Sequence, residues 1–296
     1  MNPIATQHNT WDPISAALTE DSATADISSS FFLPSDASFH AHILAREPCI
    51  IAGTQTAADT FRKVSPQVKV EILLPDASQA QSNQSVLRVE GPAAAILAAE
   101  RVALNFLQHL SGIATLTAKF VEAIRGTNAI LCDTRKTTPG LRQLEKAAVR
   151  AGGGYNHRIS LADMVILKDN HLAILRSLYP DSWHQNLAKN IQNLLAQKPH
   201  IPIAVEADSL STAQTLFSIP GISLVMLDNL SIEDIRRCVA IRPPGLLLEA
   251  TGGISLDNVR LIAQTGVDRI SVGTITHSAP AINFSLEPIE SPPLPT

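Results

Sequence analysis

Two carboxylates in this sequence each come directly after a short apolar run. Glu206 follows the run 203–205 (IAV), and Asp228 follows the run 224–227 (LVML). If both runs are neighbouring strands of a parallel sheet, the two carboxylates lie at the same end of that sheet. Mg²⁺ prefers oxygen ligands and is often shared with substrate phosphates. The pair therefore predicts a Mg²⁺ site, the alternative being salt bridges to nearby basic residues.

Basic residues hold comparable positions around two other apolar runs. Arg135 and Lys136 lie shortly after one run (AILC), and Lys168 directly follows another (MVIL), with Arg158 between them. A guanidinium group makes paired hydrogen bonds to carboxylate or phosphate, and lysine acts as a point charge. His157 could donate to the same ligand or serve a structural role. These residues predict an anion site, although any one of them could be an ordinary surface charge.

Two glycine-containing segments could bind a phosphate group. The segment Thr251-Gly252-Gly253-Ile254-Ser255 is expected to join a strand to a helix, and Ser271-Val272-Gly273 holds the same position at the next strand. Glycine lets backbone N–H groups approach an anion, and a helix N-terminus adds partial positive charge. Barrel enzymes often bind phosphate at their last two strand-to-helix loops. A tight turn without a ligand is the alternative for each segment.

The charge distribution argues for a small anionic ligand rather than a nucleic acid. The formal net charge is −4. Seven basic and two acidic residues lie between Arg135 and Lys168, which gives +5 there and −9 over the rest of the chain. Nucleic-acid-binding domains usually carry a basic excess overall. A local basic patch on an acidic protein fits a small anion, or a solvated helix face.

Cysteine usage and the chain ends predict a reduced, cytoplasmic protein. Cys49, Cys132 and Cys238 are far apart and show no metal-ligand spacing. The N-terminal residues lack a charged start followed by an apolar run, so we expect no signal peptide. No apolar run is long enough to span a bilayer. The proline-rich residues 288–296 are expected to be disordered or loosely attached.

Six apolar runs in the second part of the chain predict a parallel sheet. They are residues 129–132, 164–167, 203–205, 224–227, 246–248 and 269–272. The last four begin about every 20 to 25 residues, the length of one strand–helix unit, and continuous apolar runs are typical of strands buried on both faces. Polar residues follow all six, which favours a barrel mouth, because a doubly wound sheet needs them only at its switch point. The fold class predicted is an incomplete, open α/β barrel of about six parallel strands.

The first part of the chain predicts a separate α+β module. Its expected elements are a helix at 11–20, strands at 68–74 and 86–90, and a long helix at 92–124. We place this N-terminal domain at 1–115 and the barrel domain at 116–276. The tail 277–296 is expected to return to the first domain.

An ordered set of motifs resembles the quinolinate phosphoribosyltransferase family over essentially the whole chain. The motifs are NFLQHLSGIATLT (105–117), DTRKTTPGLR (133–142), LEKAA (144–148), GGGYNHR (152–158), ILKDNH (166–171), AVEAD (204–208), MLDN (226–229) and SVGTITHSA (271–279). The second and the fifth are the most specific. The resemblance implies an N-terminal α/β sandwich domain, an open barrel, and a homo-oligomer (dimer or hexamer). It also implies Mg²⁺-dependent transfer of phosphoribose from phosphoribosyl pyrophosphate to quinolinate, with loss of CO₂, in NAD biosynthesis.

The resemblance also implies a role for each matching residue. Quinolinate would be bound by Arg101, Arg135, His157, Arg158 and Lys168, with Arg101 reaching in from a neighbouring subunit. The ribose hydroxyls and Mg²⁺ would be held by Glu206 and Asp228, and the 5′-phosphate by Thr251, Gly252, Gly253 and Gly273. Lys136 would lie between quinolinate and pyrophosphate. The catalytic groups are predicted to be Lys136, Lys168, Glu206 and Asp228. Thr251 stands where the family commonly has serine, and it keeps the hydroxyl group.

Three alternatives compete with this interpretation. The first is a related phosphoribosyltransferase that uses nicotinate or another anionic ring without decarboxylation. The second is a Schiff-base aldolase with Lys168 as its nucleophile. The third is an inactive ligand-binding or structural protein, against which the pair Glu206 and Asp228 argues.

Overall fold

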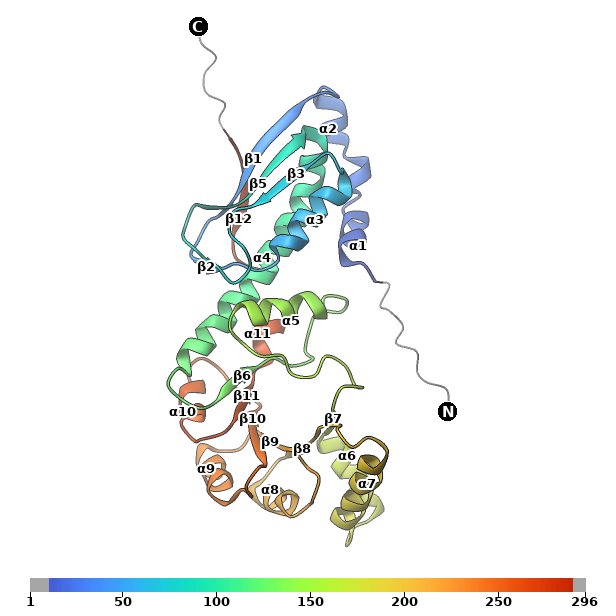
Figure 1. Ribbon diagram of the computed structural model, residues 1–296, viewed down its shortest axis with the longest axis vertical. Helices are drawn as coiled ribbons and strands as arrows, with labels where there is room; N and C mark the ends of the chain where they lie inside the picture. The colour runs from blue at the N-terminus through green and yellow to red at the C-terminus, as the bar shows by residue number, and fades with distance from the viewer. Residues whose placement is uncertain (1–10, 290–296) are drawn as a thin grey trace. The chain divides into compact units, whose positions relative to one another are not determined.

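The chain forms two compact units in a computed structural model that describes residues 11–289 (Figure 1). Unit 1 holds the described residues of Met1–Leu116, together with Thr138–Gly152 and those of Ala279–Thr296, and unit 2 holds Thr117–Thr137 and Gly153–Ser278. Residues 1–10, where we expected no signal peptide, lie outside the described residues, and so does most of the proline-rich tail. Between residues 11 and 289, no helix is long and apolar enough to cross a membrane.

Unit 1 is built on an antiparallel sheet with helices packed against it. The strand order is β12 (Phe284–Pro288), β1 (Ser38–Ala45), β5 (Gln84–Pro92) and β3 (Lys69–Ile72), and β2 (Cys49–Ile50) pairs separately with β4 (Gln79–Ala80). The helices are α1 (Pro13–Glu20), η1 (Ala23–Ala25), α2 (Ile27–Phe32), α3 (Thr54–Val64), α4 (Ala93–Ala123) and α5 (Arg142–Ala151). Helix α4 continues into unit 2 from Thr117.

The core of unit 1 lies between this sheet and helices α3 and α4. Along β1, Ala41, Ile43 and Ala45 are fully buried, while the residues between them are only partly buried. Alternation of this kind is expected when helices cover one face of an antiparallel sheet. Phe61 of α3 and Leu107 of α4 complete the same cluster. Strand β12 joins the sheet by pairing with β1, so the end of the chain does return to the first domain's sheet.

Helix α3 is capped by a residue from a distant loop. Its N-cap position is Gly53, which has no side chain and a φ of 89°. Asp76 accepts from the backbone N–H of Gly53 at 3.0 Å, and from the N–H and hydroxyl of Thr54 at 2.9 and 2.7 Å. These bonds satisfy N–H groups that have no partner within the helix.

Asp76→Ala is expected to destabilise the protein by about 1–2 kcal/mol, the usual cost of losing a helix N-cap. Urea unfolding followed by circular dichroism measures the change. Asp59→Ala is the control, because Asp59 makes only exposed contacts to Gln55 and Arg62, and such pairs contribute about 0–1 kcal/mol. Equal midpoints for the two variants would show that Asp76 does not cap α3 in solution.

Unit 2 is an open α/β barrel, as the sequence predicts. Six parallel strands lie in the order β6 (Ile130–Cys132), β11 (Arg269–Ser271), β10 (Leu247–Thr251), β9 (Leu224–Asp228), β8 (Ile203–Ala207) and β7 (Val165–Leu167). The sheet is not closed, because β6 and β7 are its two edges. The helices are α6 (Asp169–Leu178), α7 (Trp183–Gln197), α8 (Leu210–Phe217), α9 (Ile232–Ile241), α10 (Val259–Ala263) and α11 (Thr274–His277).

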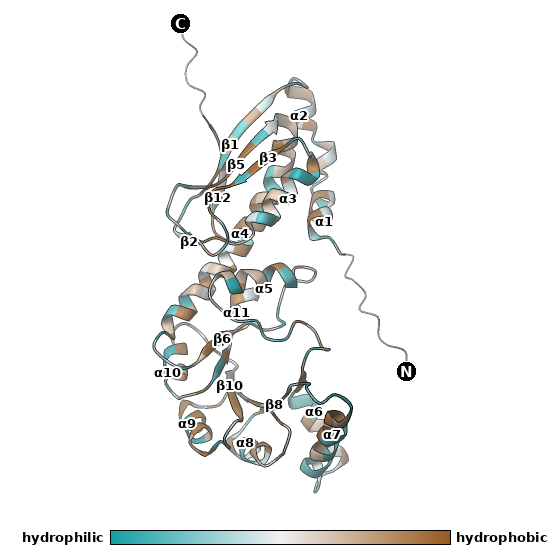
Figure 2. Ribbon diagram, viewed as in Figure 1, coloured by the Kyte–Doolittle hydropathy of each residue, from teal (hydrophilic) through white to brown (hydrophobic). Residues whose placement is uncertain are grey.

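The helices of unit 2 cover the outer face of the curved sheet (Figure 1). All five residues of β8 and the first four of β9 are buried. Strands enclosed on both faces need apolar side chains on both, which explains their continuous apolar sequence. Figure 2 shows these strands in brown, whereas the surrounding helices carry both colours. The carboxyl ends of the strands are where the polar residues begin.

Candidate active site

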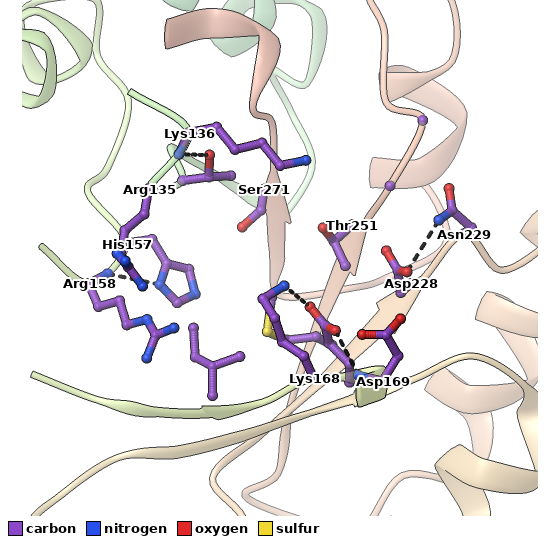
Figure 3. Close-up of a pocket in the computed structure, with 16 residues that line it drawn as sticks. Arg135, Lys136, His157, Arg158, Lys168, Asp169, Asp228, Asn229, Thr251 and Ser271 are labelled. Carbon is purple, nitrogen blue, oxygen red and sulfur yellow. Dashed lines mark hydrogen bonds and ion pairs between the residues drawn. The ribbon is translucent and has the colours of Figure 1, made fainter. Parts of the chain in front are cut away.

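A cavity of about 590 Å³ lies at the carboxyl ends of the barrel strands. That volume is within the range of small-molecule sites. The lining residues all belong to unit 2 and are Thr134, Arg135, Lys136, His157, Arg158, Ile166, Lys168, Asp169, Glu206, Met226, Asp228, Asn229, Thr251, Gly252, Gly253 and Ser271. Ten of the twelve residues predicted from the sequence are among them. Figure 3 shows the basic Arg135, Lys136 and Arg158 on one side and the acidic Asp169 and Asp228 on the other.

The acidic side of the cavity combines carboxylates with one lysine. The Nζ of Lys168 lies 2.6 Å from Oε1 of Glu206, which is nearly buried. The backbone N–H of Asp169 donates to the other Glu206 oxygen at 3.3 Å. Burial raises the pKa of Asp228, and the negative charge of Glu206 raises it further. This side of the cavity therefore favours a cation or a group that develops positive charge.

The basic side is held by a buried carboxylate outside the cavity. Asp133 is fully buried and accepts from the backbone N–H of His157 at 2.7 Å and from Nδ2 of Asn156 at 2.6 Å. The guanidinium of Arg158 donates to the carbonyl oxygen of Met164 at 2.8 Å. Burial, and then the nearby charge of Arg135, lower the pKa of Arg158. Two cations thus share a confined space, which an anion would stabilise.

Glycines at two strand ends leave room for neighbouring side chains. Gly252 has a φ of 84°, and a Cβ there would lie 2.4–2.6 Å from the side-chain amide of Asn229. The Asn229 amide in turn donates to Asp228 at 3.2 Å. At Gly273, a Cβ would lie 2.9 Å from Cδ of Lys136. The lysine stem therefore packs against this glycine, and the hydroxyl of Thr276 donates to the Lys136 carbonyl oxygen at 2.7 Å.

The first glycine segment connects β10 to helix α10 through a short turn. Helix α10 begins only at Val259, after a turn, so no helix N-terminus stands directly behind Gly252 and Gly253. Gly273, in contrast, directly precedes the short helix α11.

Two predicted residues are not among those lining the cavity. Gly273 stands beside it through its contact with Lys136. Arg101 belongs to unit 1, where it is an exposed residue of α4. The structure conversely adds Asp169 and Asn229, to which the sequence analysis gave no role, and it places Ser271 of the second glycine segment on the cavity wall. Their positions beside the strand ends were the available signal.

The surroundings of Lys168 do not support the Schiff-base alternative. Its ammonium group is ion-paired with Glu206 at 2.6 Å. A Schiff-base lysine needs a neutral amine, which desolvation or a neighbouring cation favours. Across residues 11–289, no group of three or more His, Cys, Asp or Glu side chains is arranged to hold a metal ion. The Glu206 and Asp228 pair would therefore need further ligands from outside the protein.

The fold and the cavity define an α/β-barrel enzyme whose site is built for charged ligands, with cations and carboxylates on opposite walls. Models of the quinolinate phosphoribosyl transferase family match both parts of the chain, the N-terminal domain over residues 26–111 and the C-terminal domain over 113–287. The chain belongs to the quinolinate phosphoribosyltransferase family.

Individual relatives cover nearly the whole chain. It is 38% identical to the nicotinate-nucleotide pyrophosphorylase [carboxylating] of Mycobacterium leprae, over 93% of this chain and 96% of that protein. It is 35% identical to the probable nicotinate-nucleotide pyrophosphorylase [carboxylating] of Bacillus subtilis, over 90% and 89%. The solved nicotinate-nucleotide pyrophosphorylase of Francisella tularensis superposes with a TM-score of 0.83 at 36% identity, covering 93% of this chain and 94% of that one.

Proposed function

We propose that this protein transfers phosphoribose from phosphoribosyl pyrophosphate to quinolinate, releasing pyrophosphate and CO₂ and forming nicotinate mononucleotide for NAD biosynthesis. The observation that carries the proposal is one cavity in which cations face carboxylates beside two glycine-bearing strand ends. A dianionic ring and a phosphorylated sugar need these two kinds of surface at once. Membership of the family supports the same reaction.

The basic wall is the proposed site for quinolinate. Arg135, His157 and Arg158 belong to this wall, and Lys168 would reach the same ligand from the acidic side, where it pairs with Glu206. The buried Nε of Arg135 has no acceptor among the described residues, and an unpaired buried donor is costly unless a ligand supplies the acceptor. A ring carboxylate would supply it. These groups position the dianion so that its ring nitrogen faces the sugar, which is an orientation effect.

The opposite wall is the proposed site for phosphoribosyl pyrophosphate. Thr251, Gly252, Gly253 and Gly273 would hold the 5′-phosphate, and Glu206 and Asp228 the ribose hydroxyls. The ring nitrogen forms a bond to C1 of the ribose as the bond to pyrophosphate breaks. Positive charge develops on the sugar meanwhile, and nearby carboxylates stabilise it. The alkylated ring then accepts the electron pair left by CO₂, and a proton replaces the carboxylate.

Mg²⁺ fits the acidic wall of the cavity. Burial and the charge of Glu206 raise the pKa of Asp228, so a bound cation would relieve the repulsion between these two carboxylates. Glu206 and Asp228 would hold the ion, with phosphate oxygens and water as its remaining ligands. When bound, Mg²⁺ would neutralise charge on the departing pyrophosphate.

Arg101 would complete the site from a neighbouring subunit of a homo-oligomer. It is exposed on α4 and belongs to unit 1. A guanidinium from another subunit would add a bidentate partner for one ring carboxylate. Light scattering measures whether the protein is an oligomer. The Arg101→Ala variant is expected to lose quinolinate turnover.

The function is tested by supplying quinolinate, phosphoribosyl pyrophosphate and Mg²⁺ and measuring nicotinate mononucleotide and CO₂. Nicotinate, run in parallel, is the competing acceptor. Turnover with quinolinate but not with nicotinate supports the proposal and the dicarboxylate site. Preference for nicotinate would replace it with the related, non-decarboxylating phosphoribosyltransferase.

Gly252→Ala is expected to raise the KM for phosphoribosyl pyrophosphate by about 5- to 150-fold, the range that corresponds to a strain of about 1–3 kcal/mol at a left-handed position. The added methyl group would also displace the Asn229 amide. Gly245→Ala is the matched control, since Gly245 has nearly the same φ, 83°, and open space around it. Steady-state kinetics with each substrate varied in turn measure the effect. Similar KM values in the two variants would mean that the Gly252 loop does not form the phosphate site.

A further inference from the structure

A fully buried carboxyl group lies beneath the cavity and contacts two residues that line it. Glu249 is 0% exposed and is not itself a lining residue. Its Oε1 accepts from the hydroxyl of Ser271 on the neighbouring strand β11, and its Oε2 lies 3.4 Å from Nε2 of His157. His157 and Ser271 are themselves 8% and 4% exposed. Glu249 therefore connects two separate parts of the cavity wall.

The imidazole of His157 lies between the backbone of Arg158 and the carboxyl group of Glu249. The Nδ1 atom accepts from the backbone N–H of Arg158 at 2.8 Å, as Figure 3 shows. An accepting Nδ1 carries no proton, so in the neutral ring the proton is on Nε2, the atom that faces Glu249. The Nε2 atom lies 3.4 Å from Oε2 of Glu249, which is a close contact but not a hydrogen bond. The histidine links the buried carboxyl group to the backbone of Arg158, whose guanidinium lines the cavity.

A carboxyl group is an unexpected neighbour for a site that binds a dianion. Four cationic side chains line the cavity, and a negative charge below them weakens their attraction for an anion. Its favourable contribution must then come from geometry. The Ser271 hydroxyl fixes one oxygen of Glu249, and the other oxygen lies against Nε2 of His157.

We propose that Glu249 is a positioning residue that orients His157, and through it Arg158, for binding of the anionic ring substrate. The inference rests on the proposed function, which assigns this wall to quinolinate. The donor sugar-phosphate would lie against the other wall. Loss of the Glu249 contact should therefore affect the two substrates unequally.

The test compares three substitutions by steady-state kinetics with quinolinate and phosphoribosyl pyrophosphate each varied. Glu249→Ala removes both contacts and is expected to raise the KM for quinolinate about tenfold, which corresponds to about 1.4 kcal/mol of lost binding free energy, with a change below about twofold for phosphoribosyl pyrophosphate. Glu249→Gln keeps the length and can place its amide oxygen against Nε2 of His157, so its KM is expected within about threefold of wild type. Glu249→Asp keeps the charge but shortens the side chain, and is expected to resemble the alanine variant. If Glu249→Ala is insoluble, the Gln and Asp variants answer the question together.

Asp268→Ala is the matched structural control. Asp268 immediately precedes β11 and accepts from the backbone N–H of Leu248 at 2.8 Å, so it stabilises the same two strands one residue before Glu249. It is expected to lower the melting temperature without changing the ratio of the two KM values. A double-mutant cycle with His157→Ala is expected to be non-additive, because residues in one network couple.

Several outcomes overturn the inference. An unchanged quinolinate KM in Glu249→Ala, equal changes for both substrates, or additive effects with His157→Ala would each exclude positioning through His157. A near-normal Asp variant beside a weak Gln variant would show that charge, rather than geometry, matters. Wild-type protein that does not use quinolinate would contradict the proposed function itself and remove the inference with it.

Discussion

Lys136→Ala is expected to lower kcat by about 100- to 1000-fold, the range seen when one preorganised group that stabilises transition-state charge is removed. The Lys136 stem packs against Gly273, and its backbone carbonyl accepts from Thr276. Its position on the cavity wall is thus set from two directions. We expect its ammonium group to stabilise charge on the departing pyrophosphate, an interaction that strengthens as the bond breaks.

Two further variants separate this role from a general electrostatic one. Lys136→Arg keeps the charge but carries a larger planar head against Gly273, so it should recover only part of kcat. Lys189→Ala, on the exposed surface of α7, should stay within about twofold of wild type, as surface substitutions usually do. A pre-steady-state experiment measures the chemical step directly. If Lys136→Ala changes only the KM for quinolinate, the lysine acts in binding and not in departure of pyrophosphate.

The barrel and most of the residues at its active-site end were predictable from the sequence. Strands that are buried on both faces have continuous apolar sequences, which are easy to recognise. The runs that became β8 and β9 are almost wholly apolar, and they end at the residues Glu206 and Asp228 that line the cavity. Parallel strands bring such residues to one end by topology alone. No distance had to be known for that inference.

Other features could not be predicted because they depend on contacts between residues distant in sequence. Asp76 caps a helix that begins 22 residues earlier, and no local motif reveals this. Strand β1 has only one buried face, and its polar residues weaken the apolar signal. Glu249 lies inside a strand next to the glycine segment, yet its contact with His157 spans 92 residues of sequence and becomes visible only when the strands are assembled.

Glu206→Gln is expected to lower kcat by about 100- to 1000-fold, because it removes a preorganised negative charge that stabilises the transition state in a low-dielectric site. Glu206 is nearly buried, ion-paired with Lys168 and hydrogen-bonded by the backbone of Asp169. The amide has almost the same shape and can still accept one hydrogen bond, so a purely steric role predicts little loss. A role in stabilising positive charge on the ribose, or in holding Mg²⁺, predicts a loss close to that of Glu206→Ala.

The control for this experiment is a second carboxylate at the end of the same strand. Asp208 lies just after β8, but its side chain is 60% exposed and accepts from Thr212 at 2.9 Å, and it does not line the cavity. Asp208→Asn should keep kcat within about twofold, as expected of an exposed carboxylate. Measuring kcat over a range of Mg²⁺ concentrations separates the two roles of Glu206. If high Mg²⁺ restores the Gln variant, the main contribution of Glu206 is to the metal ion. If it does not, the charge acts on the sugar. A Gln variant with kcat near wild type would contradict both, and would leave Asp228 as the only carboxylate of the pair that the reaction requires.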